Sequence, residues 1–287
     1  MATPTPTGHK PAFLHTPPRD VAAWVAAFDV ATLPILASSV ATLEELSLNE
    51  DAVDAHMLAQ ALSDDPLFAI KVFAHLAQRR RGRDGGDAET LTQALVMLGI
   101  TPFFRDFPAQ STVDEHLAEW PQALDGFNAV LARSHRAARF ALAFAVQRMD
   151  RDNAVLYGAA LLHDFAELLL WLRAPVLAIE IARRQRADST LRSAAVQLQL
   201  LNVQLADLQH ALMNEWHLPR VLIDFADAKR EATSPQARNV HLAIRLARHT
   251  AAGWDNAALA DDVRDIAALL HMAPDPTLAL LQDIDEA

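Results

Sequence analysis

His163 and Asp164 are adjacent side chains that could do chemistry in this chain of 287 residues. An imidazole nitrogen and a carboxylate oxygen can both bind a divalent metal ion, and such an ion can activate water for hydrolysis. The pair lies in an apolar stretch, 158–173, which reads GAALLHDFAELLLWLR. Because an unpaired polar group is costly to bury, the pair must either bind a metal or be satisfied by protein partners.

The elements around the pair are predicted to be helices. Apolar residues at helical spacing indicate one helix that starts at Asp152 or Asn153 and contains His163 and Asp164. A preceding helix over about 124–149 carries His135 on its apolar stripe, at spacings of three and four residues. Both histidines are therefore expected to face the interior.

Further helices are indicated by capping residues along the chain. Asp65 followed by Pro66 is typical of a helix start and predicts a helix over 67–78. Ser189 or Thr190 is expected to cap a long helix that runs through Trp216. Periodicity predicts more helices over 89–98, 236–251 and 257–271.

The composition indicates an all-α fold. Hydrophobic residues make up 52% of the chain, enough for a substantial core, and only eight glycines are available for turns. Alanine, leucine, glutamate, glutamine and arginine dominate, and all of them favour helix. We therefore expect a multi-helix bundle.

Charge and cysteine content exclude several classes of protein. The absence of cysteine excludes disulfides, thiolate catalysis and cysteine-based metal sites. A formal charge of −11 disfavours general nucleic-acid binding, which requires cations for the phosphates. No uninterrupted apolar run is long enough for a membrane span, and the first residues are rich in proline and threonine. The expectation is a cytoplasmic protein that does not bind membranes.

Arginines are concentrated in a glycine-rich segment over 79–88, which reads RRRGRDGGDA. Arg79, Arg80, Arg81 and Arg83 could together bind an anion such as the phosphate of a nucleotide. The alternative is a solvated surface loop, because no aromatic side chains alternate with the arginines. The sequence leaves both interpretations open.

Short motifs occur in a characteristic order across some 240 residues of the chain. They are Leu33-Pro34, Asp65-Pro66 with Lys71-Val72-Phe73, the segment ALVMLG at 94–99, Ser134-His135, Leu161-Leu162-His163-Asp164, and Trp216 with Leu218-Pro219. In this order the chain resembles the HDOD family, the HD-related output domain of bacterial signalling proteins, over about 33–270. The resemblance implies a helical bundle with two subdomains, the second similar to the HD phosphohydrolase fold.

The expected organisation follows from this resemblance and from the composition of the two ends. Residues 1–20 hold five prolines and are expected to form a flexible leader. The first helical subdomain is placed at 21–115 and the HD-like subdomain at 122–275. Residues 276–287 are expected to form an acidic tail with a frayed end.

The resemblance also implies a metal site, because catalytic HD proteins bind metal through a His, an adjacent His-Asp pair and a later Asp. His135, His163 and Asp164 match the first three positions. The fourth falls within 243–249, where Arg248 stands close to the place of the carboxylate. A cation there would repel a divalent metal. The motif is therefore interpreted as vestigial, without metal, cofactor or catalytic residue, and the three side chains are expected to pair with one another.

Other positions depart from the family pattern as well. Leu205 and the pair Lys229-Arg230 fall where histidines are common in the family. Ala77-Gln78 stands where an Asn-Ser pair is usual at the end of the helix that follows Asp65-Pro66. These departures weaken the expectation that this chain shares any family function that depends on those positions.

The sequence and the resemblance lead us to expect one of two functions. The first is a non-catalytic signal-transduction module that binds unidentified signalling proteins or a small ligand such as a nucleotide. The alternative is a divergent metal-dependent phosphohydrolase or phosphodiesterase, with a fourth ligand such as Asp207 or Asp224.

Overall fold

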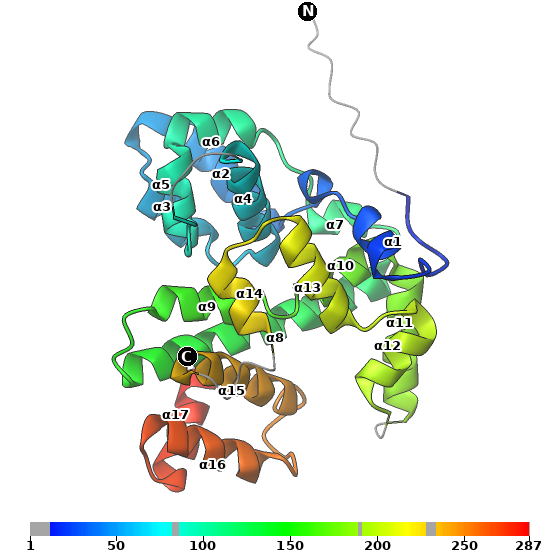
Figure 1. The fold of residues 1–287 in the computed structure, drawn as a ribbon, viewed down its shortest axis with the longest axis vertical. Helices are drawn as coiled ribbons and strands as arrows, with labels where there is room; N and C mark the ends of the chain where they lie inside the picture. The colour runs from blue at the N-terminus through cyan, green and yellow to red at the C-terminus, as the bar shows by residue number, and fades with distance from the viewer. Residues whose placement is uncertain (1–11, 82–85, 189–190, 228–233, 287) are drawn as a thin grey trace, which may run out of the picture.

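The computed structural model describes residues 12–81, 86–188, 191–227 and 234–286. Over these ranges the regular elements are helices, apart from one isolated parallel bridge between Ile35 and Thr112. The predicted all-α fold is therefore confirmed (Figure 1).

The first part of the chain forms short helices. Their bounds are α1 (Val21–Ala26), η1 (Val30–Thr32), α2 (Ala37–Ser47), η2 (Glu50–Ala52), α3 (Ala55–Leu62), α4 (Pro66–Arg79), α5 (Leu91–Leu98), α6 (Ile100–Asp106) and α7 (Val113–His116).

The remaining helices include the longest one. Their bounds are α8 (Pro121–Gln147), α9 (Asn153–Leu161), α10 (Phe165–Arg173), α11 (Pro175–Ala187), α12 (Ser193–Leu201), α13 (Leu205–Glu215), α14 (Arg220–Ala226), α15 (Pro235–His249), α16 (Leu259–Leu270) and α17 (Pro274–Glu286).

Asp65 shows how the sequence sets a helix boundary. Its Oδ1 accepts a hydrogen bond from the backbone N–H of Phe68 at 2.9 Å, and Pro66 occupies the first turn of α4, as predicted. Its Oδ2 accepts from the backbone N–H of Leu36 at 2.8 Å, which ties the entry of α2 to the start of α4. The carboxylate is buried, so these bonds replace water.

Two helices that the sequence predicts as continuous are interrupted. The helix expected from Asp152 or Asn153 through the His-Asp pair divides into α9 and α10, with His163 and Asp164 in the turn between them. The helix expected to reach Trp216 divides into α12 and α13, because Asn202 adopts the left-handed conformation with a φ of 63°. The proposed caps of that helix, 189–190, lie outside the described residues.

The helices gather in layers around α8. Figure 1 shows α2 to α6 at one end of the molecule and α15 to α17 at the other, with α8 between them. Along its length α8 packs against α9, α10 and α15. This places the turn between α9 and α10 close to two other helices.

The segment before α2 lies against helices from the second part of the chain. The backbone N–H of Leu14 donates to the carbonyl of Arg173 at 2.8 Å. Trp24 is fully buried, and its Nε1 donates to the carbonyl of Leu201 at 2.8 Å. The helix that carries Trp24, α1, packs on α13. The expectation of a loosely attached leader is thus corrected over 12–20, while 1–11 lies outside the described residues.

The expected frayed acidic tail is also corrected. Residues 274–286 form α17, and Leu281 is fully buried. Both carboxylate oxygens of Asp285 accept hydrogen bonds from Arg136 of α8, each at 2.7 Å. An apolar anchor and a bidentate ion pair therefore hold the last helix in place.

Among the described residues, the stretch Asn153–Arg173 is long and apolar enough to cross a membrane by length and composition. Within the protein, 78% of its most apolar window is buried. It comprises α9 and α10, which pack against α8. The core of a helical bundle thus accounts for its apolar character.

Candidate functional site

Asp164 is the centre of an ionic cluster formed by three separate elements. It lies in the turn between α9 and α10 and is buried. Its Oδ1 accepts from Arg248 Nη2 of α15 at 2.5 Å. Its Oδ2 accepts from Arg133 Nε of α8 at 3.0 Å. Each carboxylate oxygen therefore faces a guanidinium group from a different helix.

Two further side chains complete this cluster, which we call the Asp164 cluster. Nδ1 of His163 donates to Oδ1 of Asp164 at 3.1 Å. Nη2 of the same Arg133 donates to Oε2 of Glu167, in the first turn of α10, at 2.6 Å. The ring of His163 also meets the ring of His241 edge-on, with 6.0 Å between centroids. The cluster thus joins α8, α10 and α15 around the buried carboxylate of Asp164.

The two carboxylates respond in opposite directions to these surroundings. Burial alone would raise the pKa of Asp164, but Arg248, His163 and Arg133 outweigh it and hold that pKa well below the usual range. Burial raises the pKa of Glu167; Arg133 counteracts this rise and the charge of Asp164 adds to it. Asp164 is therefore the permanent anion of the cluster.

His135 does not join the Asp164 cluster, which corrects the expectation that the three motif side chains pair with one another. Its Nε2 donates to the backbone carbonyl of Asp64, between α3 and α4, at 2.7 Å. The hydroxyl of Tyr157 donates to the carboxylate of the same Asp64. His135 is only half-buried and links α8 to the turn between α3 and α4. Arg133, two residues earlier on α8, is the residue that contacts Asp164 instead.

The residues do not fit a divalent metal at this position. Both oxygens of Asp164 are bound by guanidinium groups, and Nδ1 of His163 is bound to the same carboxylate. Two positive charges within hydrogen-bond distance of the only carboxylate in the motif oppose a divalent cation. Over the part of the chain that the structure describes, no group of three histidine, aspartate or glutamate side chains is arranged to hold a metal ion.

The suggested replacement ligands lie elsewhere. Asp224 pairs with Arg220 along α14, with 3.1 Å between Oδ1 and Nε. Asp207 is exposed in the first turn of α13, next to the buried Leu205. The positions 229 and 230 are outside the described residues. Over the part of the chain that the structure describes, neither aspartate forms a possible metal-binding group with His163 and Asp164.

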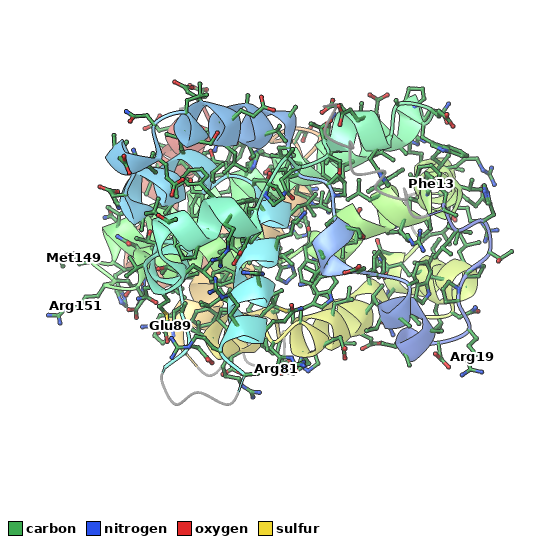
Figure 2. All side chains as sticks on the ribbon, turned by 90° about the horizontal axis from the view of Figure 1, so that it is seen from above. Phe13, Arg19, Arg81, Glu89, Met149 and Arg151 are labelled. Carbon is green, nitrogen blue, oxygen red and sulfur yellow. The ribbon has the colours of Figure 1, made fainter. Side chains whose placement is uncertain are left out.

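The arginine segment at the end of α4 is only partly available for an anion. Arg79 Nη1 already contacts Oδ2 of Asp106 at 2.7 Å, together with His75 Nε2 at 3.1 Å. Arg80 lies near the sulfur of Met97, and Arg81 is exposed at the edge of the molecule (Figure 2). Position 83 is outside the described residues. The structure therefore gives Arg79 an intramolecular partner, and anion binding at this segment stays a prediction.

Arg133 and Glu167 are members of the cluster that were not predicted from the sequence. Glu167 carries charge on the largely buried α10 and follows Asp164 by three residues, and Arg133 lies next to the buried Ser134 on α8. Charged residues with large buried neighbours are usually paired. That signal could have identified two of the five members of the cluster.

Comparison with solved structures shows the same fold. The MmoQ response regulator from Methylococcus capsulatus strain Bath matches with a TM-score of 0.65 at 21% identity, covering 84% of this chain and 98% of that chain. A virulence factor from Campylobacter jejuni matches with a TM-score of 0.60 at 18% identity, covering 83% of this chain and 85% of that chain. No curated protein matches this sequence.

The sequence profile of the HDOD domain matches residues 33–232. This range spans Asp164 and Arg133 and ends before α15, the helix that supplies Arg248. It includes the motifs from Leu33-Pro34 to Leu218-Pro219 that suggested the resemblance. From residue 33 to residue 232, more than half of its length, the chain matches this domain and thus belongs to the HDOD domain family.

Proposed function

We propose that this protein is a non-catalytic regulatory module of bacterial signal transduction, which acts by binding a partner protein or a small ligand. The observation that supports the proposal is the pairing of both Asp164 oxygens with Arg133 and Arg248. Membership of the HDOD domain family also supports a signalling role.

The chemistry of hydrolysis explains why this pairing matters. A metal-dependent phosphohydrolase needs carboxylate and imidazole ligands that are free to bind the ion that activates water. Here a metal ion would have to displace two guanidinium groups from Asp164. Breaking such charge-assisted bonds at a buried carboxylate is unfavourable. The Asp164 cluster instead acts as a fixed link between α8, α10 and α15.

The test measures metal content and hydrolysis together on the purified full chain. Elemental analysis after purification with Mn²⁺, Fe²⁺ and Zn²⁺ present should find no stoichiometric metal. Cyclic dinucleotides and nucleotides should not be hydrolysed. His163→Ala should leave both results unchanged.

The competing function, a divergent phosphohydrolase or phosphodiesterase, makes the opposite predictions. Stoichiometric metal with turnover that is lost in His163→Ala would overturn the proposal. The variant Arg248→Ala adds information, because it removes one cation from Asp164. Metal binding in Arg248→Ala alone would show that Arg248 is the group that keeps the wild-type site closed to metal.

A further inference from the structure

A cavity of about 220 Å³ lies where the segment after α1 meets the end of α10. One wall comes from residues 26–34 and the other from α7 and α10. The apolar lining includes Phe28, Leu33 and Leu172, and the polar lining consists mainly of Arg173, His116 and Asp29. The cavity is distinct from the Asp164 cluster, none of whose members lines it.

Arg173 brings a positive charge to this cavity. Its Nε donates to the carbonyl of Ala27 at 3.0 Å, and its Nη1 donates to the carbonyl of Ala12. No carboxylate among the described residues lies within ion-pair distance of this guanidinium group, whereas Arg133 and Arg136 each face one. Burial lowers the pKa of Arg173. The lining thus holds a partly desolvated cation whose partners are neutral.

A second cation stands behind the apolar wall. Nζ of Lys71 donates to the carbonyl of Leu33 at 2.7 Å and to Oε1 of Gln110 at 2.6 Å. Burial lowers the pKa of Lys71 to about 8, although the negative charges of Asp65 and Asp29 act to raise it. Asp29 itself is exposed at the rim, where its Oδ1 accepts from the backbone N–H of Ala31 at 3.0 Å. Arg173 is thus the cation that lines the cavity, Lys71 adds positive charge behind the wall, and Asp29 at the rim opposes both.

We propose that this cavity binds a small organic carboxylate. Its carboxylate group pairs with Arg173, whose planar guanidinium group matches that geometry. A short alkyl body packs on Phe28, Leu33 and Leu172. The volume is below the roughly 300–1,000 Å³ of sites for drug-sized ligands, so a nucleotide is too large. This inference goes beyond the proposed function and does not depend on the Asp164 cluster.

The first experiment titrates the full chain with butyrate by calorimetry, with butyramide and inorganic phosphate as comparison ligands. Butyrate should bind with a millimolar dissociation constant. Butyramide has the same shape without the charge and should bind at least about tenfold more weakly, because its amide lacks the attraction to Arg173. Absence of butyrate binding, or equal binding of butyramide, would overturn the proposal. Tighter binding of phosphate than of butyrate would contradict the proposal that the ligand is an organic carboxylate.

Variants separate binding from structural damage. Arg173→Gln should abolish butyrate binding, but this variant also loses a group that holds two backbone carbonyls. Asp29→Asn is the decisive variant, because asparagine keeps a capping side chain and removes the repulsive charge. It should tighten butyrate binding about threefold, a gain that local disruption does not produce. Unchanged or weaker binding in Asp29→Asn would refute the inference. Arg183→Gln, which affects only a surface pair with Glu180, is the matched control and should bind as the wild type does.

Discussion

Arg248 Nη2 lies 2.5 Å from Oδ1 of Asp164, so a helix beyond the matched family range supplies a cation to the His-Asp motif. Arg133 faces the other oxygen of the same carboxylate. The carboxylate of the His-Asp motif is thus paired with guanidinium groups from two other helices of the same chain.

Arg248→Ala should lower the free energy of unfolding by about 1–2 kcal/mol. Removing one partner of a buried ion pair costs about 3–5 kcal/mol, but the Arg248 side chain is 48% exposed and Arg133 remains beside Asp164. Urea denaturation at pH 7 measures the change. The control is Arg264→Ala, whose pair with Asp261 is fully on the surface and should contribute less than about 0.5 kcal/mol. Equal losses in both variants would contradict a special role for the Asp164 contact.

The two contacts to Asp64 should behave differently in double-mutant cycles. Tyr157 binds the Asp64 carboxylate, whereas His135 binds its backbone carbonyl. Asp64→Ala and Tyr157→Phe should therefore couple by about 1–2 kcal/mol. Asp64→Ala and His135→Ala should be additive within about 0.5 kcal/mol, because the carbonyl survives the substitution. Strong coupling between Asp64 and His135 in urea denaturation would show that the histidine depends on the side chain instead.

Two helical glycines should respond in opposite ways to alanine. A Cβ on Gly126 would lie 2.4 Å from the ring of Trp171, so Gly126→Ala should destabilise the protein by about 1–2 kcal/mol despite the higher helix propensity of alanine. Apart from the chain neighbours and the backbone of its own helix, no atom lies within 4 Å of a Cβ added to Gly158, and Gly158→Ala should stabilise the protein by about 0.5–1 kcal/mol. Thermal unfolding measures both. A gain in Gly126→Ala would mean that the Trp171 ring moves aside at little cost.

Lys71 should make stability depend on pH in the alkaline range. Its folded pKa of about 8 is below the value of about 10.4 for an unfolded lysine. Between these values the unfolded chain binds more protons, so the free energy of unfolding should rise with pH. From pH 8 to 9.5 the expected rise is about 1–2 kcal/mol. Urea denaturation should show this rise in the wild type and not in Lys71→Met. A parallel slope in the variant would assign the effect to other groups.

Local sequence signals predicted the helices well where caps and proline agree. Asp65 and Pro66 predicted the start of α4, and the predicted end at 78 is one residue from the observed Arg79. The breaks at His163 and Asn202 were missed, because the apolar period continues through both. At His163, only tertiary contacts, such as the hydrogen bonds from two arginines to Asp164, distinguish a turn from a continued helix.

The candidate site was also predictable only in part from the sequence. The sequence placed Arg248 near the missing carboxylate, and the structure brings it to Asp164. The sequence also predicted that His135 lies beside Asp164, because His135 is on the apolar stripe of α8. A helix turns by about 100° per residue, so side chains two apart point in different directions. Which of Arg133 and His135 faces Asp164 depends on the rotation of α8 against its neighbours.

The hydrogen bond from Trp24 to the carbonyl of Leu201 joins residues that are 177 positions apart. During synthesis from the N-terminus, α1 emerges long before the α13 surface that it covers exists. Trp24, fully buried in the finished protein, therefore cannot make this contact on the nascent chain until Leu201 and α13 have also been made. The docking of α1 on α13 therefore has to wait for the synthesis of all the helices between them.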